Sequence, residues 1–265
     1  MRVRAWAVLL VAAGLVTSGC GCFDGAARAG RAPARPPPRP PTTPAGTPSL
    51  GAARTAATST AAKPRSAPHA DRKPTRQLIV VTAASYRATY ARLIAYQRAS
   101  GHWRLVFGPW TARIGEAGLA PPGGKREGDD QTPSGTYRLA FMFGALPNPG
   151  VSFRYRQAHP YDVWDDDPSS ARYNEWVDTR YHDPGTGPEP MDVSGYDYGV
   201  VIAYNTARTP GLGSAIFLHV NIGTATTGCV TLPMDQLLTV LRWLRPARAP
   251  RIELGVGVES PGAPG

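Results

Sequence analysis

Residues 214–232 read SAIFLHVNIGTATTGCVTL, an apolar strand pattern that reaches His219 and is followed ten residues later by Cys229. Short runs of apolar and β-branched residues between turn-forming residues are typical of buried strands. The pattern recurs in QLIVVTA (77–83), TYRLAFMFG (136–144), YGVVIAYN (198–205) and RIELGVGV (251–258). We therefore expect residues 77–265 to form one mainly β domain, which is long enough to bury a substantial core.

Two further segments predict a β-hairpin and an α-helix. Residues 91–110 read ARLIAYQRASGHWRLVFGPW, which predicts a hairpin with Gly101 in its turn, although the residues at 86, 90, 93, 94 and 97 also fit one face of a helix. Residues 234–244, MDQLLTVLRWL, are apolar at 237, 238, 241 and 244 and predict an amphipathic helix that Pro246 ends. We expect one or two short helices in all.

Residues 145–199 are irregular in pattern and rich in polar and aromatic side chains. A long stretch without regular structure inside a compact domain is usually a binding loop or a lid. Its aromatic residues Trp164, Tyr173 and Trp176 either substitute for a local core or contact a substrate. The sequence leaves both interpretations open.

The N-terminus has the pattern of an export signal. Arg2 and Arg4 precede an apolar run over residues 5–16, and small residues lead to Cys20. The run is shorter than the roughly 20 residues that a membrane-spanning helix needs. Thr-Ser-Gly-Cys resembles a bacterial lipobox, so we expect residues 1–19 to be a signal peptide and Cys20 to be lipidated, with ordinary secretion as the alternative.

Residues 20–76 are dominated by Pro, Ala and Arg, have few large apolar side chains, and predict a disordered tether. Residues 1–76 hold 12 Lys and Arg against 2 Asp and Glu, whereas residues 77–265 hold 17 of each. The domain therefore has no basic excess for nucleic acid. The basic tether fits the anionic headgroups of a membrane, or wall polymers, outside the cell. The alternative is a solvated disordered stretch that binds neither.

Cys229 is the only cysteine after residue 22, so the domain has no internal disulfide. Exported domains normally pair their cysteines, and an unpaired one suggests chemistry. His219 could take the thiol proton and return a proton to a leaving amine. The amides around Thr227 and Gly228 could face a developing oxyanion. A buried, inert cysteine is the alternative. The histidines show no paired metal-ligand spacing, and we expect neither metal nor cofactor.

Five segments together resemble the L,D-transpeptidase catalytic domain (YkuD-like) and its actinobacterial branch with a TTGC-type motif. They are REGDDQTPSGTYRL (126–139), DDPSSARYNEWV (166–177), DYGVVIAYN (197–205), PGLGSAIFLHV (210–220) and TTGCVTL (226–232). The resemblance implies a β-sandwich-like fold with a groove beneath a lid. It also implies that Cys229 is the nucleophile and His219 the general base, with a backbone carbonyl orienting the imidazole.

Members of the family cleave peptidoglycan stem peptides between the third residue, an L-centre diamino acid, and the fourth, D-alanine. They hold the acyl group as a thioester and pass it to an amine or to water. By resemblance Arg126, Tyr173, Asn174 and Asn205 bind substrate, although Glu127 and Asp129 could instead pair with Arg126 to fix their loop. Thr226 and Thr227 replace the Ser-His of better-known members. This difference leaves open which amine accepts the acyl group, and whether the enzyme catalyses transpeptidation or hydrolysis.

The alternatives are hydrolysis of the L,D-carboxypeptidase type at the same site, a sortase-like transpeptidase, and a non-catalytic wall-binding lipoprotein. A sortase would carry an arginine on a strand after the cysteine, whereas here the arginines that follow lie on the predicted helix or beyond it. The expected role is cell-wall biogenesis and cell shape. The expected place is the outer face of the cytoplasmic membrane, and the oligomeric state is open.

Overall fold

The computed structural model describes residues 73–259 and 261. The expected signal peptide, Cys20 and nearly all of the expected tether lie outside the described residues. The domain is mainly β, as predicted, with one α-helix, α1 (Met234–Trp243), and one short 3-10 helix, η1 (Pro246–Arg248). The strands are β1 (Gln77–Ala83), β2 (Tyr90–Ala99), β3 (His102–Arg113), β4 (Leu119–Ala120), β5 (Thr132–Pro133), β6 (Gly135–Gly144), β7 (Tyr155–Gln157), β8 (Asp162–Asp165), β9 (Glu175–Asp178), β10 (Glu189–Pro190), β11 (Gly199–Ile202), β12 (Phe217–Val220), β13 (Val230–Leu232) and β14 (Arg251–Val256).

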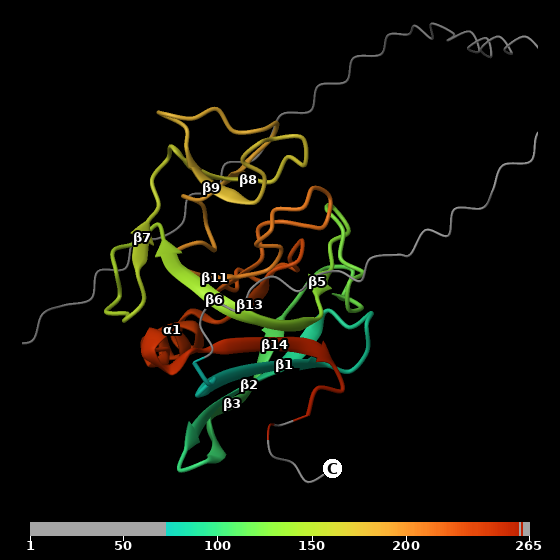
Figure 1. Cartoon of the computed structure of the whole chain (residues 1–265), viewed down its shortest axis with the longest axis vertical. Helices are drawn as coiled ribbons and strands as arrows, with labels where there is room; N and C mark the ends of the chain where they lie inside the picture. The colour runs from blue at the N-terminus through green and yellow to red at the C-terminus, as the bar shows by residue number, and fades with distance from the viewer. Residues whose placement is uncertain (1–72, 260, 262–265) are drawn as a thin grey trace, which may run out of the picture. The chain divides into compact units, whose positions relative to one another are not determined.

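Nine strands form the main sheet, in the order β11-β12-β13-β3-β2-β1-β14-β6-β7. Because β11 also pairs with β6, the first eight strands of this order close into a ring. The last strand, β14, lies parallel to the first, β1, so the two ends of the domain meet in the sheet (Figure 1). Two smaller sheets, β10-β8-β9 and β4-β5, complete the fold.

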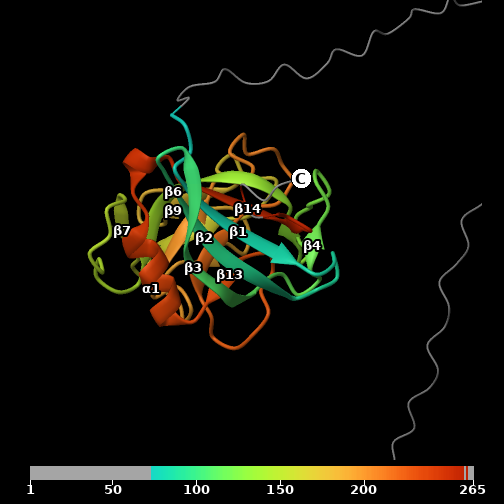
Figure 2. The same cartoon turned by 90° about the horizontal axis from the view of Figure 1, so that it is seen from below.

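The main core lies on one face of this closed sheet. Along β12 the side chains alternate, so Leu218 and Val220 enter the main core whereas Phe217 and His219 lie on the other face. Helix α1 covers the main core with its predicted apolar stripe, of which Leu237 and Leu241 are fully buried. Figure 2 shows the helix beside the edges of β3 and β13.

A second apolar cluster lies on the opposite face of β12. Phe217 stands edge-on to Phe143, Trp164 and Tyr196, with ring centroids 5.0–5.7 Å apart. Aromatic pairs favour this perpendicular arrangement. Cys229 belongs to the same cluster.

The stretch from 145 to 199 is more regular than its sequence suggested. It contains β7 to β10, of which β8, β9 and β10 form a separate antiparallel sheet (Figure 1). Short strands hidden among charged residues give little period-two signal, which is why the pattern predicted a loop. Trp164 and Trp176 both pack in the second cluster, as the structural interpretation of these aromatic residues expected.

The choice between strand and helix over residues 86–97 is resolved in favour of a strand from Tyr90, with a turn before it. β2 and β3 form the predicted hairpin, and Ser100 and Gly101 at its turn have φ angles of 49° and 82°. Two positive φ angles are what a two-residue hairpin turn of the primed type requires. Among the described residues, no helix has the length and apolar character needed to cross a membrane.

Candidate functional site

The two candidate catalytic residues are brought together by a pair of parallel strands. β12 lies beside β13, with Leu218 opposite Val230 and His219 opposite Thr231. Cys229 immediately precedes β13, two residues before Thr231, and therefore belongs to the face that carries His219. His219 and Cys229 line one pocket of about 220 Å³.

The turn before Cys229 requires glycine. Gly228 has φ +147°, and a Cβ there would lie 3.0 Å from both the Gln131 carbonyl oxygen and a methyl carbon of Ile216. The Gly228 N–H donates to the Thr226 hydroxyl at 3.3 Å, and that hydroxyl donates to the Cys229 carbonyl at 2.7 Å. Thr226 thus holds the backbone of the turn on which Cys229 is presented.

The Cys229 thiol is held from two sides. Its sulfur accepts the backbone N–H of Phe217 at 3.3 Å and donates its proton to the Ala215 carbonyl at 3.2 Å. Only 4% of the residue is exposed. Burial raises the pKa of the thiol well above its usual range, and the nearby carboxylate of Glu189 raises it further. In the free protein the group is therefore a thiol.

Two backbone carbonyls orient the imidazole of His219. Its Nδ1 lies 3.1 Å from the Gly195 oxygen and 3.0 Å from the Val220 oxygen. Carbonyl oxygens only accept, so Nδ1 carries the ring proton and Nε2 keeps its lone pair. Burial lowers the pKa of the imidazole to about 4. His219 and Cys229 thus form a neutral pair at neutral pH.

Tyr196 links the pair to a carboxylate. Its ring stands edge-on to the His219 imidazole, with centroids 4.8 Å apart, and its hydroxyl donates to Glu189. Tyr196 and Glu189 both line the pocket of Cys229. Burial raises the pKa of Glu189 to about 7, and the charges of Asp166 and Glu127 add to the rise.

A second pocket adjoins the first. It has a volume of about 330 Å³ and shares Glu189 and Thr227 with the pocket of Cys229. Its other lining residues are mostly charged or polar: Lys125, Glu127, Gly128, Asp130, Asp166, Ser214 and Ala215. The cysteine therefore lies where a compact pocket meets a predominantly acidic one.

One buried hydroxyl faces the first pocket without a partner. Thr231 is 2% exposed and lines the pocket, and its Oγ1 has no hydrogen-bond partner within the described part of the chain. Buried polar atoms are rarely left unpaired.

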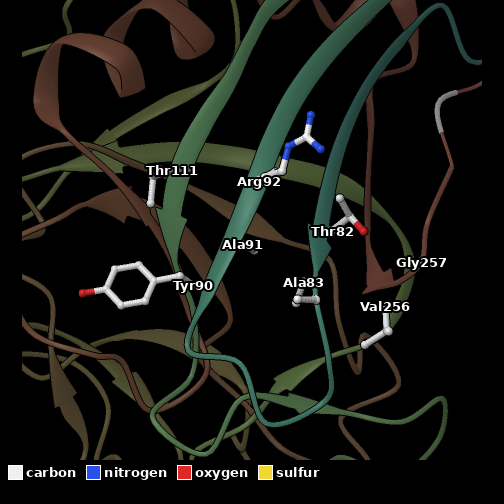
Figure 3. Close-up of a pocket in the computed structure, with 9 residues that line it drawn as sticks. Thr82, Ala83, Tyr90, Ala91, Arg92, Thr111, Val256 and Gly257 are labelled. Carbon is white, nitrogen blue, oxygen red and sulfur yellow. The ribbon is translucent and has the colours of Figure 1, made fainter.

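A larger pocket, of about 520 Å³, lies elsewhere, on strands β1, β2 and β3 and the end of β14 (Figure 3). Its lining residues include Thr82, Tyr90 and Arg92 but neither a cysteine nor a histidine. Volume alone does not make a reactive site, and we place the candidate site at the smaller pocket, which holds a nucleophile and a base.

Tyr173 and Asn174, predicted to bind substrate, have internal partners instead. The Tyr173 hydroxyl donates to Glu127 and accepts the Gly213 N–H at 3.0 Å. The Asn174 Oδ1 accepts the indole N–H of Trp164 at 3.0 Å and the Ala215 N–H at 3.2 Å. Neither residue lines the two pockets. Both fix the segment that presents the Ala215 carbonyl to the thiol.

Asn205 and Arg126 are likewise engaged with backbone. Asn205 Nδ2 donates to the carbonyls of Thr209 and Gly213 at 3.0 and 2.9 Å. The Arg126 guanidinium donates to the carbonyls of Gly123 and Lys125, and Asp129 pairs with Lys125 rather than with Arg126. Neither Asn205 nor Arg126 lines the pockets at Cys229. The alternative of a loop-fixing role fits Asp129, which also accepts the Arg126 backbone N–H.

The sequence reasoning missed Tyr196, Glu189, Ala215 and Thr231. Ala215 and Thr231 stand within the quoted stretch 214–232, but a strand pattern does not show which alternate residue faces a cavity. Tyr196 and Glu189 lie in the stretch 145–199, where no periodic pattern marked them. Cys229 and His219 were predicted because one is unpaired and the other ends the apolar run before it.

Residues 76–252 match a family described as YkuD, the L,D-transpeptidase catalytic domain. No curated protein matches the chain. Among solved structures, the helical cell shape determining protein Pgp2 from Campylobacter jejuni is similar at 16% identity and a TM-score of 0.35. The match covers 69% of this chain and 49% of that protein, so the chain spans about half its length. A likeness at this level carries no conclusion about either fold or function.

Proposed function

Because the chain belongs to the YkuD family of L,D-transpeptidase catalytic domains, we propose that it transfers acyl groups between peptidoglycan stem peptides, with Cys229 as nucleophile and His219 as base. One observation carries the assignment of roles. Cys229 and His219 line one small pocket, and the Nδ1 of His219 is bonded to carbonyls, which leaves Nε2 as the proton acceptor.

The first half of the reaction acylates the thiol. The Cys229 sulfur attacks the carbonyl carbon of the third stem residue, while His219 Nε2 takes the thiol proton. Backbone amides of the turn at Thr227 and Cys229 supply donors for the oxyanion, whereas the Gly228 N–H donates to the Thr226 hydroxyl. The C–N bond then breaks, and the imidazolium protonates the departing amine of D-alanine. A thioester on Cys229 and a neutral imidazole remain.

The second half of the reaction regenerates the free enzyme. An unprotonated amine of a neighbouring stem attacks the thioester carbon, the C–S bond breaks, and the amine proton passes through His219 to the sulfur. The pocket beside Cys229 favours an amine acceptor, because Glu127, Asp166 and Glu189 attract an ammonium group before it loses its proton. Water would give hydrolysis at the same site, which is the alternative outcome.

The neighbours of the pair have supporting roles in this proposal. Tyr196 is a positioning residue, because its hydroxyl donates to Glu189 while its ring packs edge-on against His219. Asn174 and Tyr173 act through the segment that holds Ala215, in place of the substrate contacts predicted for them.

The location of the enzyme follows from the sequence of its first 76 residues. Residues 1–19 direct export, Cys20 carries a lipid, and the Pro- and Arg-rich tether lets the domain reach the wall from the outer face of the cytoplasmic membrane. A substrate in the envelope and an exported enzyme are mutually consistent. These elements stay a proposal drawn from sequence.

The experiment that tests the function is turnover of a disaccharide-tetrapeptide, followed by mass spectrometry. The expected products are free D-alanine and a dimer joined through the third residues of two stems. Cys229→Ala and His219→Ala should each lose turnover while retaining the wild-type circular dichroism spectrum. Tripeptide without dimer would assign hydrolysis. Turnover that survives both substitutions would refute the assignment.

A further inference from the structure

A pocket with a cationic rim lies apart from the candidate active site. It has a volume of about 370 Å³ and is lined by Lys73, Arg138, Arg154 and Arg251, with no acidic residue among its lining. It shares no lining residue with either pocket at Cys229. These basic residues come from different segments: the stretch before β1, strand β6, the segment before β7, and strand β14.

The sheet places two of these charges directly opposite each other. β14 lies beside β6 in the main sheet (Figure 1), and their antiparallel register places Arg251 opposite Arg138. Like charges at directly opposed positions destabilise a pair of strands. Glu253, two residues further along β14, lies opposite Thr136 and does not line the pocket. Within residues 73–259, none of the four basic side chains forms an ion pair with a carboxylate.

The arginines are disposed to accept an anion. Arg251 is oriented by a hydrogen bond from its Nε to the Thr75 hydroxyl at 3.0 Å. Arg138 and Arg154 are exposed, so their guanidinium groups stay hydrated and accessible. Forked guanidinium donors match the oxygens of carboxylates and phosphates. Four positive charges around one pocket suit a phosphate, which carries up to two negative charges, better than a carboxylate with one.

The remaining lining of the pocket is apolar: Leu139, Ala140, Phe153, Pro246, Ala249 and Pro250. Such a surface accommodates the organic part of a ligand rather than a bare ion. We propose that this pocket binds the phosphate group of an organic phosphate, held between Arg138, Arg154 and Arg251. A bound phosphate would also relieve the repulsion between Arg138 and Arg251.

Two sources of such a group are open to an enzyme of the cell envelope: the headgroup of an anionic lipid, and a soluble or polymeric phosphoester. The chemistry at the arginines is the same for both. Lys73 is the first described residue, so the pocket lies where the N-terminal segment enters the domain. A lipid headgroup bound there would hold the domain close to the membrane.

The test is calorimetric titration of the full chain with glycerol 3-phosphate, with glycerol as the uncharged control ligand. The double variant Arg138→Gln/Arg154→Gln removes two donors, whereas Arg87→Gln/Arg104→Gln removes the same charge at exposed positions outside this pocket. We expect wild type and Arg87→Gln/Arg104→Gln to bind alike and Arg138→Gln/Arg154→Gln to bind at least about tenfold more weakly. Equal affinity in both double variants, or no binding by wild type, would overturn the proposal.

Vesicles of phosphatidylcholine with and without phosphatidylglycerol then distinguish the two sources. The basic N-terminal segment is common to all variants, so its contribution cancels. Weaker vesicle binding by Arg138→Gln/Arg154→Gln than by Arg87→Gln/Arg104→Gln supports the lipid headgroup. Equal vesicle binding together with lost glycerol 3-phosphate binding supports a phosphoester that is not lipid. Acylation at Cys229 should be unchanged in both variants, which separates this site from the proposed catalysis.

Discussion

At the scale of single residues, the candidate site is a neutral pair enclosed by protein. Burial acts in opposite directions on its two members, raising the pKa of Cys229 and lowering that of His219. Each shift favours the uncharged form. A preformed thiolate–imidazolium pair is therefore absent before substrate binds, and the proton moves as the thiol attacks.

This neutrality predicts slow alkylation of Cys229 by iodoacetamide near pH 7. Because only the thiolate reacts readily, the rate should be at least about tenfold below that of a free cysteine thiol, and it should keep rising with pH above 9. The measurement is the rate of mass gain against pH, with Cys229→Ala as the blank. A rate that is already on a plateau at pH 6 would show a stable thiolate and contradict the neutral pair.

The His219 shift also predicts how stability depends on pH. In the unfolded chain the imidazole takes up a proton as the pH falls below 6.5, whereas in the folded chain it stays neutral to about 4. The unfolded state thus binds more protons between these values, and the free energy of unfolding falls as the pH falls through this window. The contribution is about 3 kcal/mol and is fully present above pH 6.5.

Urea unfolding of wild type and His219→Gln at a series of pH values measures this contribution. The carboxyl groups are common to both proteins, so their effects cancel in the difference. Wild type should lose more stability than His219→Gln between pH 6.5 and 4. Parallel curves for the two proteins would mean that the folded imidazole titrates normally.

At the scale of elements, the geometry of the site depends on the hydrogen bonds that connect loops to strands. β12 and β13 provide His219 and the approach to Cys229, but the thiol donates its hydrogen bond to the Ala215 carbonyl, in a segment outside both strands. Asn174 holds that segment through the Ala215 N–H and also bonds the carbonyls of Tyr204 and Asn205. One side chain thus joins the β8–β9 region to the wall of the active site.

Asn174→Ala should therefore lower both stability and turnover. It removes these hydrogen bonds and places alanine at φ +59°, which together cost about 2–4 kcal/mol. Displacement of Ala215 should lower kcat about tenfold at a temperature where the variant is folded. Asn148→Ala is the matched control, since Asn148 caps an exposed turn through Gly150 and Val151. Equal kcat in the two variants would show that Asn174 does not position Ala215 for catalysis.

The strength of each local pattern explains how far the sequence predicted these elements. β1, β6, β11, β12, β14 and α1 were expected because their apolar residues recur with a clear period or in a compact run. The small strands β8 to β10 were not, because their stability comes from Trp164 and Trp176 packing on residues distant in sequence. For the same reason Cys229 and His219 could be found by residue type, whereas the contacts of Tyr196 and Glu189 depend on tertiary structure.

At the scale of the whole molecule, acidic and basic side chains gather in different regions. The domain has equal numbers of acidic and basic residues beyond position 76, yet it gathers carboxylates beside Cys229 and cations in the pocket of Arg138 and Arg251. In our proposals the acidic pocket receives an amine and the cationic pocket a phosphate. The basic N-terminal segment adds a third, less specific attraction to an anionic surface.

The central claim is that Cys229 is an activatable nucleophile in a pocket that receives a stem peptide. Its most direct test is the intact mass of the full chain after incubation with a carbapenem, a strained amide that acylates enzymes of this family. We predict a stable adduct of one carbapenem on wild type, located at Cys229 by peptide mapping, and no adduct on Cys229→Ala. An unmodified wild-type protein with an intact fold, or the same adduct on Cys229→Ala, would contradict the account.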